Sequence, residues 1–316
     1  MTVEISAATG HGKRVASRRR WLPSFEARMM APAIILLAAV SIIPFIGLVV
    51  MSFSHVRLLG GVSLSPAGLS NWRAVLTDRE TWSSWGRTLE FFVLSVGSEM
   101  IIGTVIALVL HAMRRGRSIV FSIVLLPMFL APITVGLLGS FMLDPTIGLY
   151  TWILRHLGLL ASHHALLGQR STAMFAVASL DLWEWAPLVA LIVLAGLTSV
   201  NPSILEAASV DGAGYFRKLW SIVLPSISPV LLVALLVRSM DAVRYYDIVQ
   251  IATGGGPANS TWMISQQLNE KLQGTSLDGV TTLIGQAAVI GLTMLAFSTI
   301  IANLFVRVLA RREEPR

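Results

Sequence analysis

Six long apolar segments constrain the fold of this 316-residue chain more than any other feature of its sequence. They cover residues 30–53, 88–113, 119–143, 172–198, 220–240 and 280–308. Each is near or above the roughly 20 residues that a helix needs to cross a bilayer. Because lipid offers no hydrogen-bonding partner to a free backbone, spanning segments of this kind must be helical. The sequence therefore predicts an all-α polytopic membrane protein with six transmembrane helices.

The composition agrees with a membrane protein and narrows the function classes. Hydrophobic residues make up 54% of the chain and charged residues 13%, which is about half the charged share of soluble domains. The chain has no cysteine, so a disulfide framework and a thiolate metal site are excluded. The six histidines lack zinc-type spacing, and the close pair His163–His164 falls in a polar loop, so no metal site is expected.

The net charge of +7 reports membrane topology rather than nucleic-acid binding, because the basic residues flank the apolar segments. Cytosolic loops are enriched in Lys and Arg. The basic residues on the predicted cytosolic side are Lys13, Arg14, Arg18, Arg19, Arg20, Arg28, Arg114, Arg115, Arg117, Arg217, Lys218, Arg307, Arg311, Arg312 and Arg316. Both termini are therefore predicted to face the cytosol. The first apolar run is too long for a signal peptide and has no small-residue cleavage site after it.

The predicted spans divide the chain into four parts. Residues 1–29 form a basic cytosolic tail, and residues 30–87 form the first transmembrane helix with an external loop. Residues 88–308 form a core of five transmembrane helices that includes a cytosolic loop at 201–225. Residues 309–316 form a cytosolic C-terminal tail.

The cytosolic loop at residues 201–225 carries local signals for two short helices. Asn201 is a good N-cap, and Pro202 suits the first helical position. Gly212 and Gly214 allow a sharp turn after an alanine-rich helix over 204–210. The second helix is predicted to have an apolar face formed by Phe216, Leu219 and Trp220. These signals suit either a connecting loop that rests on the membrane surface or a docking element for a partner protein.

The same loop resembles the EAA loop of binding-protein-dependent ABC importer permeases. That pattern reads Glu-Ala-Ala, three residues, Gly, nine residues, Ile, one residue, Leu-Pro. The residues that match it at every spacing are Glu206, Ala207, Ala208, Gly212, Ile222, Leu224 and Pro225. The resemblance implies that the loop is a coupling helix that docks into a cleft on an ATP-binding subunit. The coupling residues that it implies are Glu206, Ala207, Ala208, Asp211, Gly212, Ala213, Phe216, Leu224 and Pro225.

A second segment narrows the resemblance to carbohydrate permeases. Residues 241–247 and 252–257 are similar to the region after the fifth span in the type I permeases related to the maltose-system MalF and glycerol-phosphate UgpA subunits. Tyr246 stands where Phe is usual, and Ala252 stands where Leu is usual. The arrangement of Arg238, Asp241 and Arg244 is similar to that of disaccharide permeases of the trehalose type. The resemblance covers about residues 31–307.

The resemblance implies a set of partners in the prokaryotic plasma (inner) membrane. They are a second homologous permease subunit, two ATP-binding cassette subunits and an external solute-binding protein. The chain has no Gly-x-x-x-x-Gly-Lys-Ser/Thr pattern, so ATP binding by that route is excluded and the chain is not expected to be an enzyme. No cofactor is expected in this chain. ATP and Mg²⁺ would bind in the partner ATPase subunits and drive alternating access.

Polar and aromatic residues in and next to the spans are candidates for the substrate path. An ionisable residue in a span is a functional candidate because its burial in lipid is costly. A Trp can cover the face of a sugar ring, and a carboxylate can accept hydrogen bonds from sugar hydroxyls. The candidates are Asp181, Trp183, Glu184, Trp185, Asp241, Arg244, Tyr245, Tyr246 and Asp247.

Structural roles compete with these assignments. The two tryptophans could belong to the interfacial aromatic belt. Asp241 and Arg244 lie three residues apart, so on a helix they could form a structural ion pair. Glu99 is predicted to make a helix–helix hydrogen bond.

The sequence as a whole predicts the permease subunit of an ATP-driven importer for a sugar, with a disaccharide of the trehalose or maltose type as one option. An importer of the same class for polyols, glycerol-phosphate-like esters or peptides is an alternative. An ion-gradient-driven secondary transporter would share the composition but has no reason for the coupling-loop spacing. A membrane-embedded enzyme would need a catalytic cluster within the spans, and the sequence offers none.

Overall fold

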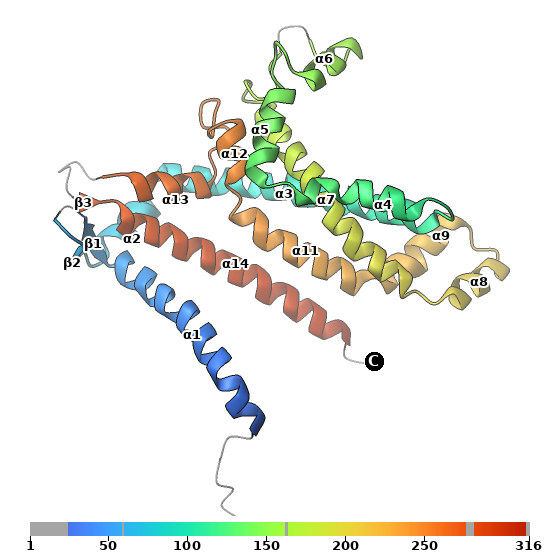
Figure 1. Cartoon of the computed structure of the whole chain (residues 1–316), viewed down its shortest axis with the longest axis horizontal. Coiled ribbons are helices and arrows are strands. Elements are labelled where there is room, and N and C mark those ends of the chain that lie inside the picture. Colours follow the sequence, from blue (N-terminus) through green and yellow to red (C-terminus); the bar gives the residue numbers. More distant parts are fainter. Residues whose placement is uncertain (1–24, 59, 162–163, 276–280, 314–316) are drawn as a thin grey trace, which may run out of the picture. The chain divides into compact units, whose positions relative to one another are not determined.

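The computed structural model describes residues 25–58, 60–161, 164–275 and 281–313 (Figure 1). The basic residues at positions 13–20, His163 and Arg316 lie outside this part of the chain. The chain forms two units, residues 1–47 and 48–316. The first unit contains most of α1 (Phe25–Ser52), which continues into the second unit and includes an apolar stretch of 24 residues at Met29–Ser52. The four-part subdivision of the sequence remains a prediction.

A small antiparallel sheet follows the end of α1 in the second unit. Its central strand β1 (Ser54–Arg57) pairs with β2 (Ser63–Pro66) and with β3 (Thr281–Thr282). The side-chain amide of Asn71 donates to the carbonyls of Ser52 and Ser54 at 3.2 and 3.0 Å. The sheet therefore ties the end of α1 to the segment that leads into the last helix.

Four helices form the body of the second unit: α3 (Arg79–Ala112), α7 (Ala173–Thr198), α11 (Ser228–Val243) and α14 (Ile284–Glu313). α3 packs along α7, and α11 contacts α3, α7 and α14 (Figure 1). The shorter helices are α2 (Ser70–Thr77), α4 (Arg117–Leu125), α5 (Pro132–Met142), α6 (Leu149–His156), α8 (Pro202–Val210), α9 (Tyr215–Lys218), α10 (Leu224–Ser226), α12 (Asp247–Ala252) and α13 (Ile264–Gln273).

The helices account for the six predicted spans, although two of the spans are broken. Among the described residues, α1, α3, α7 and α14 are each long and apolar enough to cross a membrane. Two further apolar helix pairs are bent, by 96° between Arg117–Phe129 and Pro132–Met142 and by 66° between Tyr215–Ser226 and Ser228–Val243. Counting each bent pair as one span gives six. The third and fifth spans expected over 119–143 and 220–240 are therefore bent pairs, in keeping with the prolines that each contains.

Proline explains both breaks. Leu130 and Ala131 have extended backbone just before Pro132, because the proline ring disfavours helical geometry in the residue before it. The second break falls at Ile227, two residues before Pro229. Proline lacks the backbone N–H that would continue the helix, and its ring clashes with the carbonyl four residues earlier. Both bends follow from local sequence rather than from distant packing.

A glycine lets α3 and α7 approach each other closely. At Gly103 of α3, an added Cβ would lie 2.6 Å from the Cβ of Val189 and 2.9 Å from the carbonyl oxygen of Ala186, both on α7. Real carbon atoms do not come so close, so any side chain here must push α3 and α7 apart. Small residues at helix crossings are a common means of close packing in membranes.

We expect Gly103→Ala to lower the stability of the fold by about 1–3 kcal/mol, because it overpacks the α3–α7 contact. Gly97 is a matched control on the same helix, since a Cβ there meets nothing within 4 Å. Gly97→Ala should be neutral or slightly stabilising, because alanine is the better helix former. Thermal unfolding of the two variants in the same detergent tests this, and equal midpoints would contradict the packing argument.

Candidate functional site

A fully buried arginine joins three helices at the centre of the second unit. Arg238 of α11 donates from Nε and Nη2 to the two carboxylate oxygens of Glu99 on α3, at 2.5 and 2.9 Å. Its Nη2 also donates to Asp181 of α7 at 3.1 Å. All three side chains have 0% exposure. Such a forked arrangement is the geometry in which guanidinium and carboxylate groups bind most strongly.

Two further contacts complete this cluster. The hydroxyl of Ser95 lies between the two acids, with a 2.7 Å hydrogen bond to Glu99 and a second hydrogen bond to Asp181. The guanidinium carbon of Arg238 stands over the ring of Trp185 at 4.8 Å from its centroid. A cation over an indole face is attracted by the ring quadrupole. The arginine therefore fixes the position of both an acid and an aromatic ring that the sequence places among the substrate-path candidates.

A second pair of candidates extends the cluster along α7. Glu184 is fully buried and accepts a 3.4 Å hydrogen bond from the hydroxyl of Tyr245. The Tyr245 ring stacks on Phe91 of α3 at a centroid distance of 5.2 Å. Asp181 and Glu184, three residues apart, thus present their carboxylates on one face of α7.

The edge of the cluster is more accessible. The predicted pair of Asp241 and Arg244 is present, with Arg244 Nη2 donating to Asp241 at 2.6 Å. The second oxygen of Asp241 lies 3.7 Å from Nη1 of Arg238. Tyr246 and Asp247 are half-buried at the start of α12, where the Tyr246 hydroxyl accepts a 2.7 Å hydrogen bond from Asn269. The Tyr246 side chain therefore contacts α13.

Several buried polar atoms of the cluster have no hydrogen-bond partner within the described protein. They are Asp181 Oδ1, Glu184 Oε1, Trp185 Nε1 and Arg238 Nη1. Buried donors and acceptors in native proteins are almost always paired with protein or with water. The cluster thus holds unused donors and acceptors beside an aromatic ring.

The tryptophans that flank Glu184 separate onto different faces. Trp183 is 46% exposed and lines two cavities on the outer side of α7. One cavity is also lined by residues of α5, and the other by Pro127. Trp185 is half-buried over Arg238. Residues two apart on a helix point about 200° apart, which explains the separation. The four candidates within segment 181–185 are therefore divided between the cluster and an outer surface.

Two members of the cluster were absent from the predicted site. Glu99 was expected to make only a helix–helix hydrogen bond, and Arg238 was noted only for its resemblance to disaccharide permeases. Both are ionisable residues inside apolar helices, which is the signal that could have selected them. Their partnership spans 139 positions in the sequence and therefore needed the fold.

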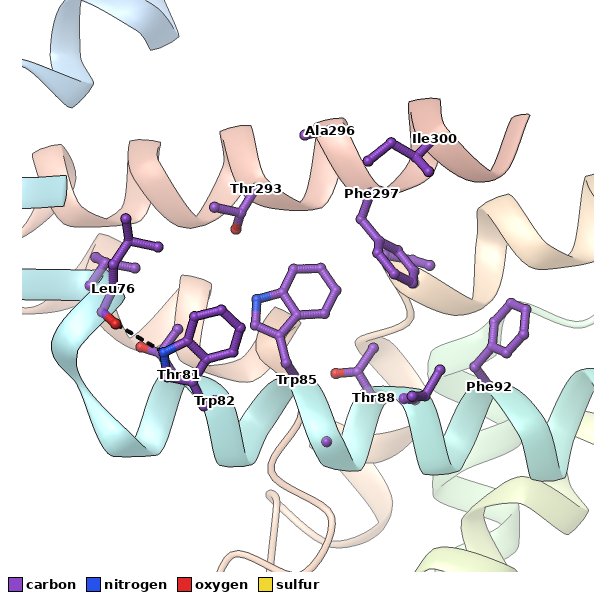
Figure 2. Close-up of a pocket in the computed structure, with 14 residues that line it drawn as sticks. Leu76, Thr81, Trp82, Trp85, Thr88, Phe92, Thr293, Ala296, Phe297 and Ile300 are labelled. Carbon is purple, nitrogen blue, oxygen red and sulfur yellow. Dashed lines mark hydrogen bonds between the residues drawn. The ribbon is translucent and has the colours of Figure 1, made fainter. Parts of the chain in front are cut away.

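A large apolar cavity between α3 and α14 lies apart from this cluster (Figure 2). It has a volume of about 480 Å³, and its walls include Trp82, Trp85, Phe92 and Phe297. Its threonines are already engaged: the Thr88 hydroxyl, for example, donates to the carbonyl of Ser84 and accepts from the N–H of Ile264. A sugar would find few free polar groups there.

The predicted coupling loop forms the helix–turn–helix expected from its sequence. Asn201 caps α8 by accepting the N–H of Ser203 at 3.0 Å, and Pro202 is the first residue of the helix. Gly212 has a φ of +76°, the left-handed conformation that glycine adopts most easily, and ends α8. The next helix, α9, passes into a π-helical turn at Leu219–Val223.

The implied coupling residues occupy an accessible surface. Those that are exposed are Glu206, Ala207, Asp211, Gly212, Phe216 and Pro225, whereas Ala208, Ala213 and Leu224 are half-buried. Of the three residues expected on the apolar face of the second helix, Leu219 lines a cavity beneath the loop, while Phe216 and Trp220 are 73% and 69% exposed. The four-residue spacing of Phe216 and Trp220 places them together on the outer side.

An exposed helix–turn–helix on a bundle of apolar helices with a buried polar cluster is consistent with a membrane permease. Residues 99–315 match the family described as "Binding-protein-dependent transport system inner membrane component". The chain belongs to this family, and the predicted family is confirmed. It is an inner-membrane permease component of a binding-protein-dependent ABC transport system.

Several permeases of known function are similar to this chain in sequence. The trehalose/maltose transport system permease protein MalF of Thermococcus litoralis is 38% identical over 228 residues, which cover 71% of this chain and 77% of the relative. The trehalose transport system permease protein SugA of Mycobacterium tuberculosis is 32% identical over 254 residues, 80% of this chain and 78% of the relative. The sn-glycerol-3-phosphate transport system permease protein UgpA of Yersinia pestis is 33% identical over 243 residues, which cover 75% of this chain and 81% of the relative.

The fold also matches a solved structure. A chain of a bacterial ABC transporter involved in the import of the acidic polysaccharide alginate superposes with a TM-score of 0.74 at 22% identity. The match covers 91% of this chain and 95% of the other. The predicted type I importer permease fold is therefore confirmed.

Proposed function

We propose that this chain and a second homologous permease subunit form the translocation path for a carbohydrate. The observation that carries the proposal is the group of unpartnered buried polar atoms beside Trp185, because sugars present both hydroxyl edges and apolar ring faces. The names of the trehalose/maltose and trehalose permeases among the relatives support the same substrate class.

The proposed assembly contains more than the two permeases. A solute-binding protein delivers the sugar on the outer side, and two ATP-binding cassette subunits bind ATP and Mg²⁺ on the cytosolic side. The exposed surface around Gly212 and Phe216 supports this arrangement, since apolar side chains there need a protein partner. The basic loops between the spans support cytosolic termini.

Uptake in proteoliposomes tests the proposed function. The chain is co-purified with its candidate partner subunits, reconstituted, and given labelled trehalose or maltose outside and ATP inside. Ionophores collapse all ion gradients. The proposal predicts ATP-dependent accumulation of one of these sugars. Accumulation that needs an ion gradient and ignores ATP would establish a secondary transporter instead.

The two tryptophans of α7 provide a residue-level test of the path. We expect Trp185→Leu to raise the KM for sugar uptake about 10-fold or more, because a stacked aromatic ring contributes on the order of 1–2 kcal/mol. Trp183→Leu, a matched change two residues away on the exposed face, should leave KM within about 2-fold. Equal effects of the two substitutions would contradict the assignment of the sugar to the Arg238 side of α7.

A further inference from the structure

The charges of the cluster are unevenly balanced. Among the described residues, Arg238 is the only Lys, Arg or His side chain that is fully buried. It is already bound by two carboxylates, those of Glu99 and Asp181. The acidic side chains in and at the edge of the cluster are Glu99, Asp181, Glu184, Asp241 and Asp247. The positive ones are Arg238 and Arg244, of which Arg244 is 76% exposed and paired with Asp241.

The pairing of Arg238 with carboxylates leaves little positive charge in the cluster to attract an anion. The Nε and Nη2 groups of Arg238 face carboxylates within 3.1 Å, and its Nη1 faces Asp241 at 3.7 Å. A phosphate or carboxylate group brought to the cluster would compete with Glu99 and Asp181 for the same guanidinium. Like charges repel strongly where water is excluded, and a desolvated charge without a partner is costly.

We propose that Glu99 is a specificity-determining residue: it neutralises Arg238, so that the cluster accepts uncharged sugars and rejects sugar phosphates and sugar acids. Glu99 acts through Arg238 and need not touch the cargo. This inference rests on the proposed carbohydrate path and goes further by naming the charge class of the cargo. The proposed cargo class differs from the cargo in the name of the sn-glycerol-3-phosphate permease and from the acidic polysaccharide of the transporter that this chain resembles in fold.

The geometry makes Glu99 the residue to change. It contributes both oxygens of the forked pair, whereas Asp181 contributes one oxygen to Arg238 and leaves the other free. Replacing Glu99 by Gln keeps the side-chain shape, removes one negative charge and releases the guanidinium to bind an anion. Asp241→Asn is a milder change of the same kind at the accessible edge, where the Asp241 side chain is 29% exposed.

Equilibrium dialysis of the nanodisc-reconstituted complex, without its binding protein, tests the inference with trehalose and trehalose 6-phosphate as probes. Omitting the binding protein removes that protein's own selectivity. We expect wild type to favour trehalose at least about 10-fold, equivalent to a 1.4 kcal/mol difference. Glu99→Gln should shift the ratio of the two dissociation constants about 10-fold or more toward the phosphate. Asp241→Asn should shift it in the same direction by less.

Glu90→Gln is the matched control, because Glu90 lies on the same helix and is exposed on the opposite side. It should leave the ratio unchanged. If Glu99→Gln does not fold, the ratio of the two dissociation constants in wild type and in Asp241→Asn still tests the inference. The inference is overturned if wild type binds both probes equally, or if neither substitution changes the ratio of the two dissociation constants. In either case, ATP-driven sugar uptake would still support the proposed function. If wild type binds neither probe and accumulates no sugar, the proposed function fails and the inference fails with it.

Discussion

Replacing Arg238 by methionine should destabilise the protein by about 3–5 kcal/mol, the largest effect that we expect from any single substitution. The change leaves Glu99 and Asp181 buried at 0% exposure without their counter-charge. Removing one partner of a buried ion pair is costly because the remaining charge has lost its compensation. Thermal unfolding of the purified chain in detergent or nanodiscs measures the loss. Arg238→Lys should fall in between, since an ammonium group cannot make the forked contact.

Further variants separate the effect of the lost charge on stability from the effect of the changed side-chain shape. The triple variant Glu99→Gln, Asp181→Asn, Arg238→Met removes all three charges and should recover part of the lost stability. Arg244→Met is the matched control on the exposed arginine, and it should cost less than about 1 kcal/mol because surface pairs contribute little. An Arg238→Met variant that is as stable as wild type would show that the cluster is not an ion-pair network.

Gly212→Asp should abolish sugar-stimulated ATP hydrolysis while the helices remain folded. Gly212 has a positive φ, and a Cβ there meets nothing within 4 Å, so the chain itself can accommodate the new side chain. Aspartate is also among the residues that tolerate left-handed backbone best. The added charge projects from the turn into the proposed contact with the ATPase subunit. We expect the affinity for that subunit to fall roughly 30-fold or more, as for loss of an interface hot spot of about 2 kcal/mol.

Gly116→Asp is the control for this prediction. Gly116 has a φ of +72°, is exposed and also has open space around its Cβ position, but it lies in the loop between α3 and α4. Hydrolysis measured on the co-purified complex should be near the wild-type rate in Gly116→Asp and near the unstimulated rate in Gly212→Asp. Equal rates in the two variants would remove the coupling assignment from the turn at Gly212.

The coupling loop could be predicted from sequence because its structure is set by local signals. Asn201 caps the helix, Pro202 starts it and Gly212 ends it, and each effect acts within a few residues. The breaks at Pro132 and Pro229 carry signals of the same kind, because proline kinks or ends a helix. Proline alone does not set the size of a bend, since Pro187 lies inside the unbroken helix α7.

The buried cluster could be predicted only in part. Asp181, Glu184 and Trp185 were selected as polar or aromatic residues within one span, and helix periodicity alone places Trp183 on a different face from Trp185. The binding of Arg238 by Glu99 joins positions 139 residues apart. No pattern in a single sequence specifies which two ionisable residues of different spans meet. The charge balance of the site therefore followed from the fold.

Site-directed cross-linking from the coupling loop tests the central claim most directly, and the absence of cysteine from the chain makes it straightforward. Val210, at the end of α8, is 89% exposed, so Val210→Cys places a single reactive thiol on the proposed docking surface. In inverted vesicles that contain the whole complex, a short reagent that joins a thiol to an amine should link this residue to a lysine of an ATP-binding cassette subunit, whereas Ser140→Cys on α5 should give no such product. Labelling of Val210→Cys from the outer side of the membrane, or cross-linking that never involves an ATPase, would contradict the account.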